Sequence, residues 1–161
     1  MDKDYIPLLS VIVGGLLSTL GGFFANYMLQ SKSRDAEKRK LTRDKLEEAY
    51  LLSHEVIDWI QKQMKEMAAF AGGEDAHCPI ERVVMLIKFY EPKLTPSAVE
   101  FAQNVEVFKS RVFEYWKETH NANTKLPVEK FTGLIEQPFN DVNNSYEKFL
   151  DSIQNVMHEN L

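Results

Sequence analysis

The chain has 161 residues, with 24 acidic and 19 basic side chains and a formal net charge of −5. This acidic balance disfavours a protein whose main partner is the phosphate backbone of a nucleic acid. A single cysteine, Cys78, excludes an intrachain disulfide and agrees with a reducing compartment. The sequence contains no HExxH motif, no GxSxG motif and no glycine-rich phosphate loop, so we expect no cofactor.

The N-terminal segment is an uncharged run from Tyr5 to Ser31, whose core, Ile6 to Leu29, is predicted to form one membrane-spanning helix. These 24 residues give about 36 Å of helix, enough to cross a hydrocarbon core of about 30 Å. A cleaved signal peptide is the alternative, but the run is not preceded by net positive charge and no small-x-small pattern follows it. We therefore interpret residues 1–31 as a short tail and a retained transmembrane helix.

The next segment, residues 32–45, is predicted to be a basic juxtamembrane helix. It holds seven basic and three acidic side chains, whereas residues 46–161 hold 11 basic and 19 acidic ones. This local charge places the N-terminus outside and the C-terminal part in the cytoplasm, as in a single-pass protein of a bacterial inner membrane. It is either a simple orientation signal or also a contact for anionic lipid headgroups. The candidate headgroup contacts are Lys32, Arg34, Lys38, Arg39, Lys40 and Arg43.

One face of the predicted span carries small residues, and the opposite face carries bulky apolar ones. Small residues at four-residue spacing let two helix backbones approach closely. Since the chain supplies only one such span, we expect self-association, either as a tight dimer or trimer or as a ring around a narrow pore. The candidate packing or pore-lining residues are Ser10, Gly14, Ser18, Gly21, Gly22 and Ala25.

Residues 46–161 are predicted to form a cytosolic bundle of four or five helices, so the fold class is all-α. No proline or glycine interrupts residues 32–71, which predicts that the span continues into the first bundle helix. Further helices are expected at 80–90, from Thr95-Pro96 to about Thr119, after Pro127, and to the C-terminus, with a break or kink at Pro138. The expected apolar stripe of the first helix is Leu46, Tyr50, Ser53, Ile57, Ile60, Met64, Met67 and Ala71.

Candidate metal ligands are few. His54 and Asp58 lie one helical turn apart, and His77 precedes Cys78, but neither pair belongs to a four-ligand pattern. We interpret the first pair as a solvated helix face and Cys78 as a loop thiol. No metal site is predicted.

Arg111 and His120 form an arrangement that resembles HEPN domains, small helical domains in which an arginine and a histidine of each of two copies cleave RNA. The resemblance implies a catalytic role for these two side chains. Eight residues separate them here, more than in the family, and Val112 replaces the usual polar residue after the arginine. On a continuous helix they would lie on opposite faces, so they could converge only if the helix broke.

The whole layout, an outward N-terminus, one span and a cytosolic helical bundle, resembles small membrane accessory proteins of bacterial antiviral systems, including CRISPR-associated ones with HEPN-like domains. This resemblance implies an oligomeric pore or membrane-permeabilising effector, gated when a cytosolic protein or signal acts on the bundle. The alternative is a membrane-tethered adaptor that docks a cytosolic protein. The candidate docking aromatics are Trp59, Tyr90, Tyr115 and Trp116.

Overall fold

The structure, a computed structural model, describes residues 5–69, 77–122 and 128–159, with only the backbone described for 5–18, 120–122, 128–129 and 159. Within these ranges every regular element is helical, and the all-α prediction is confirmed. The elements are α1 (Tyr5–Ala69), α2 (Ile80–Tyr90), the 3₁₀ turn η1 (Pro92–Leu94), α3 (Thr95–Ala122) and α4 (Val128–Glu159).

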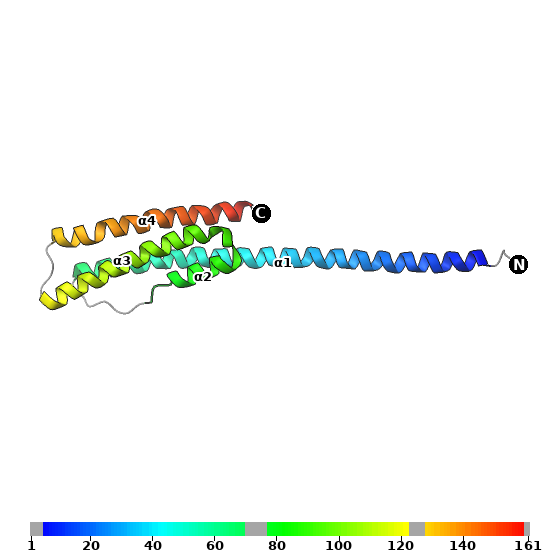
Figure 1. Cartoon of the computed structure of the whole chain (residues 1–161), viewed down its shortest axis with the longest axis horizontal. Coiled ribbons are helices and arrows are strands. Elements are labelled where there is room, and N and C mark those ends of the chain that lie inside the picture. Colours follow the sequence, from blue (N-terminus) through cyan, green and yellow to red (C-terminus); the bar gives the residue numbers. More distant parts are fainter. Residues whose placement is uncertain (1–4, 70–76, 123–127, 160–161) are drawn as a thin grey trace. The chain divides into compact units, whose positions relative to one another are not determined.

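The chain divides into two compact units, Met1–Leu41 and Thr42–Leu161. In the first unit the described part is a stretch of α1 alone, and its side chains from Thr19 to Lys40 are exposed. The second unit holds the remainder of α1 together with α2, η1, α3 and α4 (Figure 1). The predicted continuity of the first helix through residues 32–69 is confirmed, since α1 is unbroken there.

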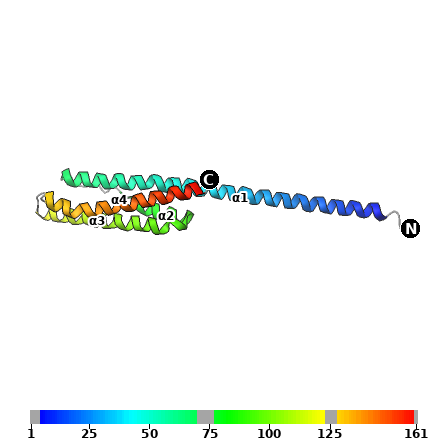
Figure 2. The ribbon, with the colours of Figure 1, turned by 90° about the horizontal axis from the view of Figure 1, so that it is seen from above.

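The second unit is an up-and-down bundle in which α2 is the short member (Figure 2). Contacts fix the directions: Met67 and Trp59 of α1 meet Tyr115 and Phe108 of α3 in the same order, so these two helices run parallel. Glu100 of α3 pairs with Lys148 of α4, whereas Glu118 pairs with Lys130, so α3 and α4 run antiparallel.

The core is built from one face of each helix. Its largest fully buried side chains include Phe101, Phe108 and Phe149, and the rings of Phe101 and Phe149 stack with centroids 5.9 Å apart. Burying each of these rings contributes about 2–3 kcal/mol to folding. The three phenylalanines therefore hold α3 against α4 and α1.

The buried seam of α1 differs from the predicted stripe by one residue at every second position. Leu46, Ser53, Ile60 and Met67 are buried as predicted, while Tyr50, Ile57 and Met64 are only partly buried. Ala71 lies outside the described residues. The residues buried in their place each come one position earlier in the sequence: Ala49, Val56 and Gln63. Because Ala49 is small and Gln63 is polar, the apolar periodicity of the sequence did not indicate that these positions are buried.

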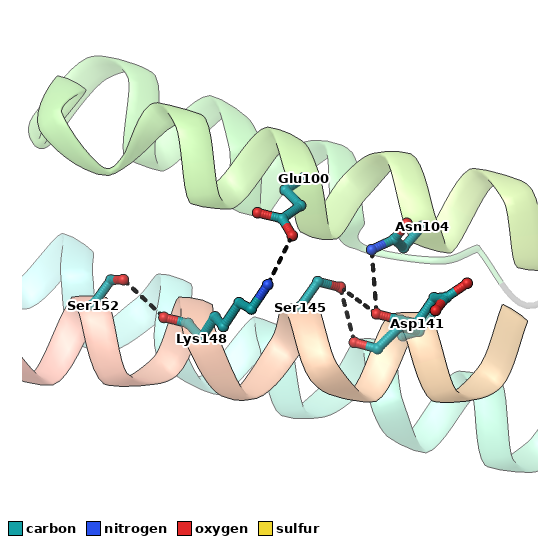
Figure 3. Close-up of polar contacts among 7 residues, drawn as sticks. Glu100, Asn104, Asp141, Ser145, Lys148 and Ser152 are labelled. Carbon is teal, nitrogen blue, oxygen red and sulfur yellow. Dashed lines mark hydrogen bonds and ion pairs between the residues drawn. The ribbon is translucent and has the colours of Figure 1, made fainter. Parts of the chain in front are cut away.

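The interface between α3 and α4 also contains polar contacts (Figure 3). Asn104 Nδ2 donates to the backbone carbonyl oxygen of Asp141 at 3.2 Å. The hydroxyl of Ser145 donates to the same carbonyl oxygen at 2.9 Å, within α4. Lys148 Nζ lies 3.3 Å from Glu100 Oε1 at the exposed edge of the interface. These contacts fix the register of the two helices where apolar packing alone allows sliding.

Two predicted helix boundaries need correction. Thr95 is already helical, with φ −54° and ψ −42°, because η1 precedes it and leaves no extended capping residue. Pro138 lies inside α4, so the two predicted C-terminal helices are one element. A proline removes one backbone hydrogen bond from a helix, but the packing of Ile135 and Val142 on either side holds this helix in place. The described bundle therefore has four α-helices.

Candidate functional site

The candidate membrane-contacting surface lies on α1 between Leu20 and Leu29. Phe23 is 78% exposed and Tyr27 68% exposed, and no part of the described chain covers them. The same stretch holds four more exposed large apolar side chains: Leu20, Phe24, Met28 and Leu29. Such a cluster on a single helix is not stable in contact with water and marks a surface for lipid or for another protein.

The predicted span extends beyond the residues whose side chains are described. Over the described residues, none of the helices has a stretch that is both long and apolar enough to cross a membrane. The side chains of 5–18, which make up the first half of the predicted span, lie outside that set. The helix is therefore observed, and the membrane crossing stays a prediction.

The predicted packing face can be inspected at Gly21, Gly22 and Ala25. A Cβ atom added at either glycine meets no heavy atom within 4 Å, and Ala25 is exposed. The side chains of Ser10, Gly14 and Ser18 lie outside the described set. The described part of the chain thus brings nothing of its own against this face.

The six candidate headgroup contacts, Lys32, Arg34, Lys38, Arg39, Lys40 and Arg43, are all exposed. Arg43 Nε forms an ion pair with Glu47 Oε1 at 3.1 Å, one turn further along α1. Among described residues the other five have no ion-pair partner. Exposed, unpaired cations on one segment suit contact with anionic headgroups.

Where α1 meets α2, two basic side chains form ion pairs with one carboxylate on the surface. Lys45 Nζ lies 2.8 Å from Glu48 Oε2, and Arg82 of α2 binds the other oxygen of the same carboxylate. The hydrogen bond from Lys45 and then that from Arg82 lower the pKa of Glu48, and Glu48 raises the pKa of Lys45. This arrangement links α1 to α2 and leaves no group free for chemistry.

His54 and Asp58 do not form a metal site. His54 Nδ1 lies 2.6 Å from the hydroxyl of Tyr146 on α4, and the rings of His54 and Tyr50 form a T-shaped pair with centroids 4.7 Å apart. The two groups share one hydrogen bond, and the imidazole tautomer decides which of them donates it. No group of three metal-ligating side chains exists among the described residues. His54 therefore joins two helices.

Arg111 and His120 do not converge in the described backbone. α3 is unbroken to Ala122, so positions 111 and 120 lie nine residues apart on one helix, on opposite sides of its axis. Arg111 Nη1 forms an ion pair with Glu114 Oε2 at 2.7 Å. The side chain of His120 is outside the described set. The helix break that the RNA-cleavage interpretation requires is not present.

The candidate docking aromatics belong to the core. Tyr115 is buried, and Trp59, Tyr90 and Trp116 are partly buried and pack against the core. Cys78 lies in the connection before α2, as predicted, but its side chain is also buried, and burial raises the pKa of its thiol. These side chains lie in or against the core and stabilise the bundle.

A shallow groove between α2 and α3 was not predicted from the sequence. Its volume is about 320 Å³, and it is lined by Ile80, Glu81, Val84, Ala102 and Glu106. Glu106 is paired with Lys109 at 2.6 Å, whereas Glu81 has no ion pair among the described residues. The groove offers an apolar floor with carboxylates at its rim.

Comparisons with known proteins find no matching family model, no matching curated protein and no matching solved structure. Function must therefore be argued from the residues themselves.

Proposed function

We propose that this chain is a self-associating, single-span membrane protein whose helical bundle faces the cytosol and controls an oligomeric, membrane-permeabilising assembly. The observation that carries the proposal is the cluster of exposed apolar side chains between Leu20 and Leu29. It continues the apolar sequence of residues 6–19 along the same unbroken helix. A bacterial inner membrane is the environment that best matches this cluster and the basic segment after it.

The free energy of hydration supports lipid as the surrounding medium. Moving a large apolar side chain out of water is favourable by about 1.5–3 kcal/mol, so the six exposed side chains together favour burial by roughly 10 kcal/mol. Tyr27 near the basic segment suits the headgroup region, where aromatic rings with a polar end are favoured. The bundle, in contrast, buries a core of its own that draws on all four helices.

Self-association is supported by the glycine face. Open space at Gly21 and Gly22 leaves room for another helix backbone at close range. A second copy is the simplest supplier of that backbone. If several copies close into a ring, weakly polar residues such as Thr19 and Asn26 would line the opening, which would then select poorly between ions.

The experiment is a dye-release assay on liposomes that contain the purified full-length protein, with particle imaging of the same sample. Gly22→Leu should abolish both the ring and the release, because the added side chain blocks close helix contact. Leu17→Ile, on the bulky face, is the matched control and should keep both. Release by Gly22→Leu at the level of the unaltered protein would refute the pore.

A membrane-tethered adaptor is the second candidate, and the groove between α2 and α3 favours it. An apolar floor with the unpaired Glu81 at its rim suits an apolar segment with a basic residue. An adaptor predicts that Ala102→Trp, which fills the groove, abolishes partner capture while Gly22→Leu does not. A pore predicts that Gly22→Leu abolishes dye release while Ala102→Trp does not.

A further inference from the structure

One end of the bundle combines exposed apolar and basic side chains. The turn from α2 through η1 into α3 lies at the end where the bundle part of α1 begins (Figure 1). Arg82 binds Glu48, and Lys45 is close enough to Tyr90 for an electrostatic interaction, which ties α2 to the first turns of that part of α1. The C-terminal residues of α4 lie at this end too (Figure 2).

Two large apolar side chains and two lysines are exposed at this end of the bundle. Phe89 is 77% exposed and Met85 is 48% exposed, one turn apart on α2. Lys88 on α2 and Lys93 on η1 are also exposed and have no ion-pair partner among the described residues. The acidic residue of the same turn, Glu91, is only partly exposed. What distinguishes this end is that the exposed phenylalanine lies one turn from an exposed methionine and close in sequence to two unpaired lysines, a combination that suits an apolar and anionic surface.

We infer that Met85, Lys88, Phe89 and Lys93 form a docking patch by which the bundle contacts the surface of an anionic lipid bilayer. This inference rests on the proposed function, because residue 42, where the bundle part of α1 begins, follows the predicted span by only eleven residues. Aromatic and aliphatic side chains enter the interfacial region of a bilayer while lysines reach its phosphates. The basic segment 32–45, which we propose as a contact for the same headgroups, also carries several exposed cations.

The opposite end of the bundle provides a matched position. Phe113 on α3 is 71% exposed, nearly as much as Phe89. It lies near the end of α1, where the hydroxyl of Tyr115 binds the carbonyl oxygen of Met67. Its neighbour Glu114 is paired with Arg111. An equally exposed phenylalanine is therefore present at the end that should not touch the membrane.

The experiment uses the full-length protein in lipid nanodiscs, with an environment-sensitive fluorophore attached at Phe89→Cys or at Phe113→Cys. Cys78 is buried and its thiol pKa is raised, so it should resist labelling in the folded protein. Discs of phosphatidylcholine alone are compared with discs that contain phosphatidylglycerol, and each contains a nitroxide quencher at headgroup depth. Co-flotation of the protein with lipid is measured on the same samples.

We expect quenching at position 89 to be at least about twofold stronger than at position 113, and to increase with phosphatidylglycerol. Charge reversal by Lys88→Glu with Lys93→Glu should remove that increase, and Lys117→Glu at the other end should not. Equal quenching at the two positions in floated protein would overturn the docking patch while leaving the span intact. Loss of the protein from the floated fraction would overturn the span and, with it, the patch.

Discussion

The hydroxyl of Tyr115 secures the C-terminal end of α1, and Tyr115→Phe tests that contact. The hydroxyl donates to the carbonyl oxygen of Met67 at 2.8 Å, and Tyr115 is only 3% exposed. Met67 lies in the last turn of α1, where carbonyl oxygens have no donor within their own helix. Phenylalanine keeps the ring packing on Trp116 and Phe131 and leaves this buried carbonyl without its partner.

The expected loss of stability is about 1–2 kcal/mol, which combines the net worth of one hydrogen bond with the cost of an unsatisfied buried acceptor. Urea unfolding of the full-length protein in detergent, followed by the fluorescence of Trp59 and Trp116, measures it. Tyr146→Phe is the matched control. Its hydroxyl partner, His54, is exposed, so water can replace the bond and the loss should be smaller.

The same variant should change the response to alkaline pH. Burial raises the pKa of Tyr115 above its ordinary value of about 10. The folded protein therefore holds the phenolic proton more tightly than the unfolded chain. This contribution is complete below pH 10 and is lost as the pH rises through the folded pKa. Equal alkaline destabilisation of the unaltered protein and Tyr115→Phe, or equal urea stability of the two, would refute the reasoning.

Three further predictions concern the bundle. Phe108→Ala should destabilise the protein by about 3–5 kcal/mol in urea unfolding, because it leaves a cavity in the core, and the exposed Phe113→Ala should change stability far less. Cys78 should react with a thiol reagent only at the rate of unfolding, so fast labelling in native buffer would contradict its burial. The pKa of Glu48 is lowered in the folded protein, so its ionised carboxylate stabilises the fold at any pH above the unfolded pKa. This stabilisation is lost as the pH falls through the folded pKa. In a series of melting curves at different pH, Glu48→Gln should therefore flatten the decrease in stability on the acid side, and Glu55→Gln should not.

Sequence periodicity was sufficient to predict the helices of the bundle. The apolar run of α2 could have formed a strand, but it has no second strand to pair with, and it is a helix. The exact seam of α1 was harder, because Ala49 and Gln63 carry little apolar signal although both are buried. Pro138 predicts a break or a kink, but the described helix α4 continues through it.

The candidate apolar surface between Leu20 and Leu29 was predictable because its signal is local, whereas the contacts between bundle helices were not, because they join residues far apart in the sequence. His54 and Tyr146 are 92 residues apart, and no local sequence pattern predicts their hydrogen bond. The exposure of Phe89 is similarly hidden, since α2 is apolar on most of its surface and only packing decides which side chain is left outside. Charge counts located the basic segment 32–45 because that signal is local.

Two of the contacts that join the helices are accepted by backbone carbonyl oxygens, those of Met67 and Asp141. Every residue type carries the same carbonyl, so only the donors Tyr115 and Asn104 are constrained chemically. In natural variants of this chain we expect the two donors to persist, position 141 to vary more widely, and Met67, which is buried, to change only to other apolar residues. Mutational tolerance should therefore be asymmetric across each contact, which a saturation library at these four positions would measure directly.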